Sequence, residues 1–383
     1  MGNVLAPSSE AELAEIVANS TAAFEILGGG GKRGLGRPVE AEQLFNLSSF
    51  AGIGLYEPEE LILEAGAATP LKTIEAVVAA AGQQLAFEPP DLSKLYGTGS
   101  GGTLGGVVAC NLSGPRRIKA GAARDHVLGA TGVSGRGDRF RAGARVVKNV
   151  TGYDLPKLLT GSYGTLAALT SVTLKVLPRP ETEETVVAAG LDDRAAVLAM
   201  TVAMQSPCEV SGAAHIPGTG TFLRLEGIAP SVAYRREKLK AVLGGELTSL
   251  AAEESAAQWI AIRDAAMIGR EATRVVWRIS AAPSEGPEVM ARIKDQADVR
   301  FFFDWAGGLI WLDVSLTEDA SAAIVRGAIT TGNATLMRAP AAIRSRVEVF
   351  QPQAPALGAL TARVKASFDP RARLNPGRMY RGI

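Results

Sequence analysis

The sequence predicts an α+β fold of two domains, the second smaller than the first and built on an antiparallel sheet. Strand-like apolar runs alternate with helix signals over the first 90 residues. Residues 178–180 read Pro-Arg-Pro and are followed by glutamates, which is the clearest linker signal in the chain. A length of 383 residues is also what two domains with buried cores require.

The elements of the first domain are predicted from their end signals and apolar runs. Ser9 and Glu12 form a capping box that opens a helix reaching about residue 19. Pro70 in the first turn and Gly82 just past the end bound a second helix. The other predicted elements are a short helix at 154–161 and strands at 24–27, 44–47, 61–65, 127–133, 144–147 and 166–177.

Beyond the linker, strand and helix candidates alternate without an internal sequence repeat, which favours an α+β layout. The strands are predicted at 221–225, 275–279, 300–303 and 309–314. The helices are predicted at 232–243, 251–266, 288–297 and 320–328, with a last one at 356–368.

Composition excludes several classes of protein. Apolar residues make up 47% of the chain, and 40 Lys and Arg nearly balance 39 Asp and Glu, so neither a disordered chain nor a dedicated nucleic-acid binder is expected. Glycine is enriched, with 43 residues or about 11% of the chain, against roughly 7% in ordinary proteins. These glycines have no three-residue period, which excludes a collagen-like chain.

Cysteine and histidine are too few for several kinds of site. Cys110 and Cys208 do not make a disulfide scaffold or a metal cluster, and with only His126 and His215 no metal site is predicted. The chain shows no signal peptide and no long apolar stretch. We therefore expect a cytoplasmic protein, with peripheral membrane contact through a partner left open.

A first glycine-rich loop, at 28–36, directly follows a predicted strand. Gly29, Gly31 and Gly34 formally fit G-x-G-x-x-G, but the residues after them are a poor helix start and a helix precedes the strand, so a dinucleotide-binding βαβ unit is not favoured. A Walker A loop is excluded because Arg33 follows Lys32 where Ser or Thr is needed. Consecutive glycines beside two cations still favour a bound phosphate, with a merely flexible turn as the alternative.

A second glycine-rich loop, at 97–106, favours the phosphate hypothesis over the flexible turn. Thr98 and Thr103 are small donors among glycines, and Gly105 and Gly106 stand at the start of a predicted helix, whose N-terminus attracts anions. Two separate loops of this kind fit a long dinucleotide better than a mononucleotide.

The order of these motifs resembles the flavoproteins of the vanillyl-alcohol oxidase and p-cresol methylhydroxylase (PCMH) fold, in the branch of 2-hydroxy acid oxidases. The matching stretches are 28–36, 98–114, 124–129, 148–155 with 161–166, and the ending Asn375-Pro376-Gly377. Among these proteins the chain is most similar to the smaller FAD-binding subunits (E subunits) of bacterial glycolate oxidases. It is short, and the His-rich metal motif of the catalytic relatives has no counterpart.

The resemblance implies a PCMH-type FAD-binding domain of two α+β subdomains at 1–180, a reduced cap domain at 181–338, and a C-terminal segment at 339–383 that returns to the FAD domain. FAD is expected to be held non-covalently, because Lys32 stands where some relatives carry the attached histidine. The implied cofactor-binding residues are Gly28, Gly29, Gly30, Gly31, Lys32, Arg33, Gly34, Thr98, Gly99, Gly101, Gly102, Thr103, Gly105, Gly106, Asn111, Asp125, Val127, Gly152, Tyr153, Leu166 and Asn375.

The resemblance also implies a function in a complex with a larger flavoprotein subunit and an iron–sulfur subunit. Glycolate, a small 2-hydroxy acid, would be oxidised to glyoxylate, with electrons leaving through the flavin to the iron–sulfur partner. Two alternatives stay open, namely a structural or electron-relay subunit without catalysis of its own, and a stand-alone alcohol oxidase. No catalytic base is assigned.

Several polar residues outside the loops have two interpretations each. His126 is interpreted as a structural histidine, and His215 either faces the flavin or lies on the surface. Arg224 and Arg278 on cap strands either bind a carboxylate or form a solvated face. The basic stretch 116–148 is interpreted as a solvated hairpin rather than a partner surface, and the aromatic run 301–305 as core.

Overall fold

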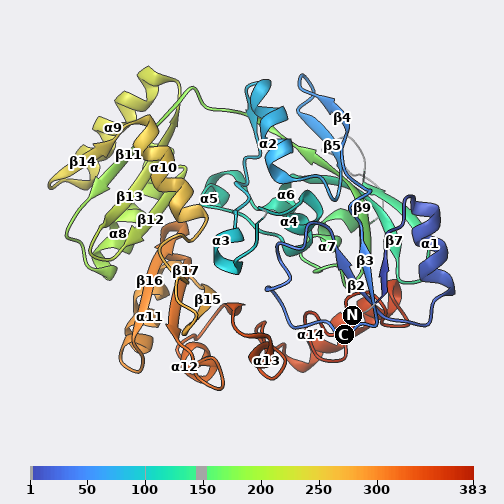
Figure 1. The fold of residues 1–383 in the computed structure, drawn as a ribbon. Helices are drawn as coiled ribbons and strands as arrows, with labels where there is room; N and C mark the ends of the chain where they lie inside the picture. Colours follow the sequence, from blue (N-terminus) through green and yellow to red (C-terminus); the bar gives the residue numbers. More distant parts are fainter. Residues whose placement is uncertain (1–2, 100, 144–152) are drawn as a thin grey trace. The chain divides into compact units, whose positions relative to one another are not determined.

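The computed structural model describes residues 3–99, 101–143 and 153–383, and it divides into two compact units (Figure 1). The first unit consists of residues 1–112, 121–178 and 352–383. The second consists of residues 179–351 together with a short stretch, 113–120, that leaves the first unit and returns to it. The domain boundaries predicted at 180 and 338 stay predictions.

One sheet of the first unit is parallel and carries the first glycine loop. Its three strands run in the order β1 (Asn3–Leu5), β3 (Gln43–Asn46) and β2 (Phe24–Leu27). Helix α1 (Glu10–Asn19) packs on it through Leu13 and Val17, both fully buried. The Ser9 hydroxyl accepts from the Glu12 amide as predicted, but the Glu12 carboxylate accepts from Ser8 rather than closing the capping box.

The second sheet of this unit is antiparallel and holds five strands. They run in the order β4 (Ile53–Glu57), β5 (Ile62–Gly66), β9 (Ala167–Lys175), β7 (Val127–Ser134) and β8 (Arg139–Gly143). A small pair is formed by β6 (Gln83–Gln84) and β10 (Leu177–Pro178). The strand predicted at 144–147 lies outside the described residues.

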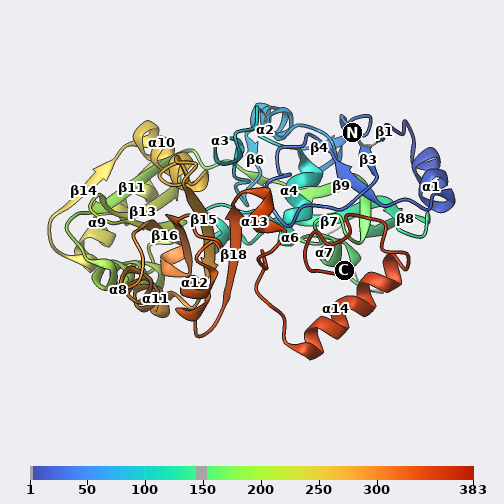
Figure 2. The same cartoon turned by 60° about the horizontal axis from the view of Figure 1, so that its bottom comes forward.

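Short helices connect these sheets and leave loops between them. They are α2 (Leu71–Ala80), α3 (Ser93–Tyr96), α4 (Leu104–Cys110), α6 (Ala123–His126), α7 (Leu155–Leu159) and α14 (Pro355–Phe368), the last of which Figure 2 draws in red. After α14 the chain forms a bridge between Leu374 and Phe24 of β2. The C-terminal residues therefore lie against the strand that leads into the first glycine loop.

The second unit is one eight-stranded antiparallel sheet with a repeated layout. Its first half is β11 (Thr182–Ala188), α8 (Asp193–Gln205), β12 (Gly212–Ile216), β13 (Gly220–Gly227), α9 (Ala229–Leu243) and β14 (Leu247–Leu250). Its second half is β15 (Arg274–Ser280), α11 (Gly286–Lys294), β16 (Val299–Asp304), β17 (Leu309–Ser315), α12 (Ala322–Gly327) and β18 (Asn333–Arg338). Both halves are β-α-β-β-α-β units with the strand order 4-1-3-2, although the sequence shows no repeat.

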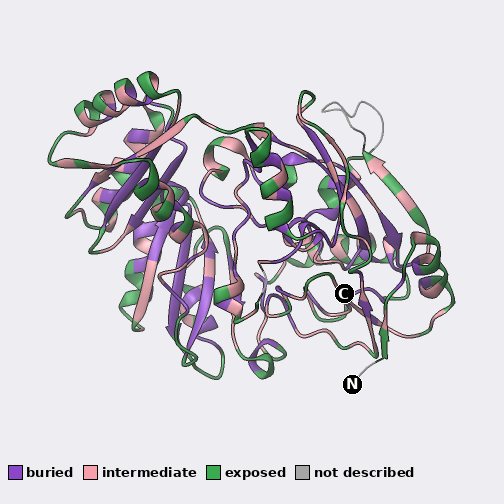
Figure 3. Cartoon of the chain, turned by 45° about the horizontal axis from the view of Figure 1, so that its top comes forward, coloured by how far each residue is buried: buried purple, intermediate pink, exposed green. Residues whose placement is uncertain are grey.

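The two halves meet at a pairing of β12 with β16, where His215 lies opposite Phe303. Helix α10 (Ala252–Arg263) follows the first half, α13 (Ala341–Arg344) follows the second, and α5 (Arg117–Ala120) belongs to the stretch 113–120. The strands of this sheet are mostly buried (Figure 3), with Trp277 and Phe302 fully so. The predicted core assignment of the aromatic run is confirmed for Phe302, Phe303 and Trp305.

The predicted α+β fold is thus confirmed, and most predicted elements appear within a few residues of their expected ends. Eight strands, β1, β4, β6, β8, β11, β12, β14 and β18, were not predicted. None of the helices in the described ranges is long and apolar enough to span a bilayer.

Candidate functional site

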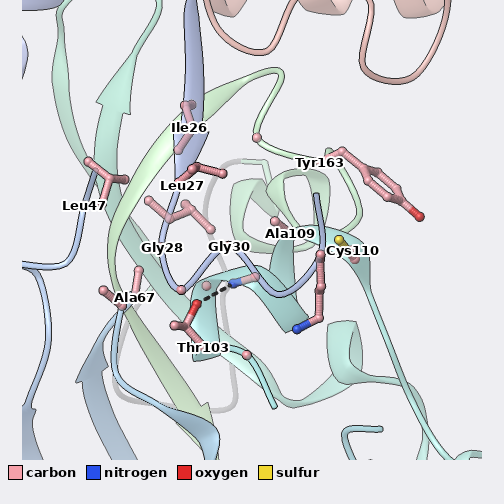
Figure 4. A pocket seen from close by; sticks show the side chains of 18 of the residues that line it. Ile26, Leu27, Gly28, Gly30, Leu47, Ala67, Thr103, Ala109, Cys110 and Tyr163 are labelled. Carbon is pink, nitrogen blue, oxygen red and sulfur yellow. Dashed lines mark hydrogen bonds between the residues drawn. The ribbon is translucent and has the colours of Figure 1, made fainter. Parts of the chain in front are cut away.

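A pocket in the first unit collects both glycine loops (Figure 4). It holds about 800 Å³ of space free of atoms, open solvent at its mouth included. Apolar side chains such as Ile26, Leu47 and Leu169 form its walls. The polar contribution comes mainly from backbone and from three cations, Lys32, Arg33 and Arg378, and no acidic side chain of the described residues lines it.

The first loop, at 28–34, presents unused backbone donors to this pocket. Gly30 has a φ of +70°, and the turn is closed by bonds from the Arg33 amide to the Gly30 carbonyl and from the Leu35 amide to the Lys32 carbonyl. Within the described part of the chain, the four N–H groups of residues 29–32 have no acceptor. Free amides on consecutive residues of a glycine-rich loop are a typical binding surface for a phosphate.

Lys32 adds a cation that makes no direct ion pair within the described residues, although the Asp91 carboxylate acts on it from a distance. Its side chain is half-buried, and among the described residues its ammonium forms no hydrogen bond or ion pair. A Cβ placed on Gly102 would lie 2.2 Å from the Lys32 Nζ, so the ammonium lies directly against the bare backbone of the second loop. Burial lowers the pKa of Lys32, which is the expected effect of desolvating an ammonium that lacks a close anion.

Arg378 and Arg33 differ in how their charges are compensated. Arg378 is buried, and within residues 3–99, 101–143 and 153–383 its guanidinium donates only to the carbonyls of Lys32 and Arg37, at 3.0 and 3.4 Å. Burial lowers the pKa of Arg378, although a guanidinium remains charged near neutral pH. Arg33 instead pairs with Glu25 through two hydrogen bonds. In the part of the chain that the structure describes, Lys32 and Arg378 thus have no carboxylate partner, and a bound anion could pair with both.

The second loop contributes packing rather than free donors. Gly102, Thr103, Gly105 and Gly106 line the pocket. The amides at the start of α4 already have acceptors. Leu104 donates to the Thr69 carbonyl, and Gly105 donates to the Ala67 carbonyl. Gly106 donates to the Thr103 hydroxyl, a bond drawn as a dashed line in Figure 4. The expected anion site at this helix start is therefore not available, and the glycines serve close approach: a Cβ on Gly105 would lie 2.8 Å from that of Ala67.

Some predicted residues of the two loops lie outside the pocket lining. Gly34 packs against Tyr96, whose ring would be 2.5 Å from a Cβ at that position. Gly101 packs against the Asp91 carboxylate, whose Oδ2 would lie 2.8 Å from a Cβ at Gly101. Thr98 donates its amide to Ser93 at the end of α3, and Gly99 has open space around it.

The predicted residues beyond the loops are also mostly outside the lining. Asn111 ends α4 with a φ of +49° and accepts from the Arg124 amide, and Asp125 accepts from the Ala122 amide. Val127 and Leu166 are buried, whereas Tyr153 is 90% exposed. Gly152 lies outside the described residues.

Asn375 is brought to the pocket, and several lining residues are new. The Asn375 side chain accepts from the Ile26 amide and donates to the Tyr163 carbonyl, both at 2.8 Å. The lining residues that the sequence did not indicate are Ile26, Leu27, Leu47, Ala67, Ala68, Ala109, Cys110, Tyr163, Gly164, Ala167, Leu169 and Arg378. For Arg378 a signal was present, since it directly follows Asn375-Pro376-Gly377.

The second unit holds a buried charge cluster that includes the stretch 113–120. Arg116 forms a forked contact with Glu226 at 2.5 to 3.0 Å, and Glu226 lies across the strands from Glu183. Burial alone would raise the pKa of Glu226, but Arg224 and Arg116 outweigh it and lower the value to about 2. For Glu183, burial prevails and raises the pKa. The interpretation of Arg224 as part of a solvated face is wrong, since it is 1% exposed.

The histidines and the remaining arginine have structural contacts. His126 is buried, and its ring lies 5.5 Å from that of Phe87. His215 is buried, its Nδ1 lies 2.9 Å from the Thr221 hydroxyl, and burial lowers its pKa, so the surface interpretation is wrong. Arg278 stacks on Trp305 at 4.9 Å, and Arg117 approaches the same ring at 4.2 Å. Among residues 3–99, 101–143 and 153–383, no group of three His, Cys, Asp or Glu could hold a metal ion.

Comparison with known proteins gives a consistent picture. Residues 2–143 match a family model described as an FAD binding domain. The chain is 36% identical to glycolate oxidase subunit GlcE of Escherichia coli, over 93% of this chain and 92% of that protein. It is 38% identical to glycolate oxidase subunit GlcD of Bacillus subtilis over 36% of this chain and 27% of GlcD. The structure of p-cresol methylhydroxylase with substrate bound superposes with a TM-score of 0.74, at 12% identity, covering 98% of this chain and 88% of that one.

Proposed function

The chain belongs to the family of glycolate oxidase subunit GlcE, and on that premise we propose that it binds FAD non-covalently as one subunit of a complex that oxidises glycolate to glyoxylate. The observation that carries the proposal is a pocket wall in which, as far as the structure describes the chain, four amides have no acceptor and two cations have no carboxylate partner. A diphosphate is the part of FAD that such a wall satisfies.

The remaining lining fits the rest of the cofactor. Apolar walls from Leu27, Leu47 and Leu169 suit the uncharged portions of a dinucleotide, and Asn375 holds β2 and the Tyr163 turn in place. When bound, FAD supplies a two-electron acceptor for the oxidation of a 2-hydroxy acid. In this proposal the residues at 28–32, Lys32 and Arg378 bind the diphosphate, and no residue is assigned as catalytic base.

The name of the E. coli relative, a subunit of glycolate oxidase, supports membership of a complex. We propose a larger flavoprotein subunit of the GlcD kind and an iron–sulfur subunit as partners, with electrons leaving through the iron–sulfur subunit. The charge cluster in the second unit is saturated by its own ion pairs and is not assigned a substrate role.

The test is spectroscopic. The purified chain is expected to be yellow, or to take up one equivalent of added FAD, and to release it into the supernatant on acid precipitation. A colourless chain that binds no added FAD would overturn the proposal in favour of a structural subunit, and flavin that stays with the precipitate would overturn the non-covalent assignment. Anaerobic glycolate is then added with and without the partner subunits. Bleaching that needs the partners supports a complex, and bleaching without them identifies independent catalysis.

A further inference from the structure

Helix α14 has a burial pattern opposite to that of an ordinary surface helix. Leu357 and Leu360 are exposed, at 51% and 47%, whereas Lys365 is the one buried side chain of its 14 residues, at 5% exposure. Burying an ammonium is unfavourable unless all of its donors find acceptors. The position of Lys365 therefore requires compensating contacts.

Those contacts join helix α14 to the backbone at Thr165 and to the segment that follows the helix, from Asp369 to Leu374. The Lys365 ammonium donates to the Asp369 Oδ2 at 2.7 Å, to the Thr165 carbonyl at 2.6 Å and to the Leu374 carbonyl at 3.0 Å, which uses all three of its protons. The same Asp369 oxygen accepts from the Leu374 amide at 2.8 Å. Asp369 is 1% exposed, and a Cβ on Gly135 would lie 2.2 Å from its other oxygen, so the carboxylate is enclosed from both sides.

From Leu374 the contacts continue through Asn375 to residues that line the pocket. Leu374 forms a bridge with Phe24, and the next residue, Asn375, accepts from the Ile26 amide and donates to the Tyr163 carbonyl. Ile26 and Tyr163 both line the pocket, and Ile26 lies two residues before the glycine loop. Asn375 has a φ of +44°, a conformation that needs support from its neighbours.

We infer that the Lys365–Asp369 pair is a positioning element for the cofactor pocket. The pair fixes the backbone of Leu374, which holds Asn375 between β2 and the Tyr163 turn. The same segment places Arg378 within hydrogen-bond distance of the Lys32 carbonyl. This inference rests on the proposed function, because the pocket is taken to bind FAD. Neither residue of the pair lines the pocket, so both act through Asn375 and Arg378.

The first test compares Lys365→Met with a matched control in the second unit. Arg274→Met breaks a similarly buried pair, since Arg274 Nε lies 2.6 Å from the Asp313 carboxylate. Both variants are expected to unfold at a lower temperature than the wild type. Only Lys365→Met is expected to weaken FAD binding, by about 10-fold, because it loosens Asn375 and Arg378 without removing a direct contact to the cofactor. Lys365→Arg, which keeps the cation, is expected to restore part of the affinity.

The second measurement needs no cofactor. The Ile26 amide, bonded to Asn375, is expected to exchange its hydrogen faster in apo Lys365→Met than in apo Arg274→Met. If Lys365→Met does not fold, Asp369→Asn, which keeps the side-chain volume, is measured in the same way. Wild-type FAD affinity and unchanged Ile26 exchange would overturn the inference and leave the proposed function intact. A wild-type chain that binds no FAD would overturn the proposed function, while Ile26 exchange would still decide the positioning role.

Discussion

The guanidinium of Arg378 donates a hydrogen bond of 3.0 Å to the backbone carbonyl of Lys32, a residue 346 positions away in the sequence. The C-terminal segment thus shapes the glycine loop directly. It also brings a second cation to a pocket wall where Lys32 has no counter-ion in the described structure. An anion bound there would pair with both cations, and we expect FAD to raise the unfolding temperature of the chain.

Replacing Lys32 by Met is expected to weaken FAD binding by about 10- to 100-fold, because a charge-assisted contact to the diphosphate is lost. The measurement is a titration followed by flavin fluorescence at low and at high salt. Lys94→Met, on the exposed part of α3, is the matched control and should bind FAD as the wild type does. Equal affinity of the two variants would show that Lys32 does not contact the cofactor.

Adding a single methyl group at Gly102 is expected to weaken FAD binding by at least about 10-fold, because it displaces the Lys32 ammonium and strains the backbone of the second loop. A Cβ there would lie 2.2 Å from the Lys32 Nζ, and the φ of +94° disfavours any side chain. Gly99→Ala is the control, because Gly99 has open space around it and no positive φ. Both variants are compared by FAD titration and by circular dichroism, and a Gly102→Ala chain that is folded and fully loaded would contradict the assignment of this wall.

The thiol of Cys110 offers a probe that requires no substitution at the pocket. Burial raises the pKa of Cys110, so its thiolate is scarce and iodoacetamide should modify it slowly at pH 7. Bound FAD is expected to slow the reaction further, since Cys110 lines the pocket. A Cys208→Ser background removes the other cysteine, which is fully buried. Modification at the same rate with and without FAD would place the cofactor elsewhere.

The second unit is expected to lose stability in acid through Glu226. Its pKa falls from 4.5 to about 2 on folding, so its contribution is complete above pH 4.5 and is lost as the pH falls toward 2. The shift corresponds to about 3 kcal/mol of unfolding free energy. We expect Glu226→Gln to be less stable than the wild type already at pH 7. In urea titrations between pH 7 and pH 3, its free energy of unfolding should then fall less steeply than that of the exposed control Glu246→Gln.

The sequence predicted those parts of the fold whose signals are local. Helix ends at Ser9 and Gly82 and the strand at 24–27 depend on neighbouring residues, and they appear where expected. Strands such as β4 and β14 were missed, because they are short and partly exposed and so lack a clear apolar alternation. Their positions are decided by pairing with strands distant in the sequence.

The site was predicted only as far as residue type allows. The first loop could be identified from its glycines and cations, but whether an amide is free depends on tertiary contacts. Gly105 and Gly106 fit an anion site in sequence, yet their N–H groups are taken by Ala67 and Thr103. From the sequence, Arg116 is interpreted as part of a solvated basic stretch. The structure shows instead that its guanidinium pairs with the Glu226 carboxylate.

The repeated β-α-β-β-α-β layout of the second unit has a consequence for aggregation. Each half alone would expose β12 or β16 as an open sheet edge, a ready template for pairing with another chain. Joining the halves in one polypeptide covers both edges at once, so only β14 and β18 remain at the margins of the sheet. The junction around His215 and Phe303 thus serves solubility as well as shape.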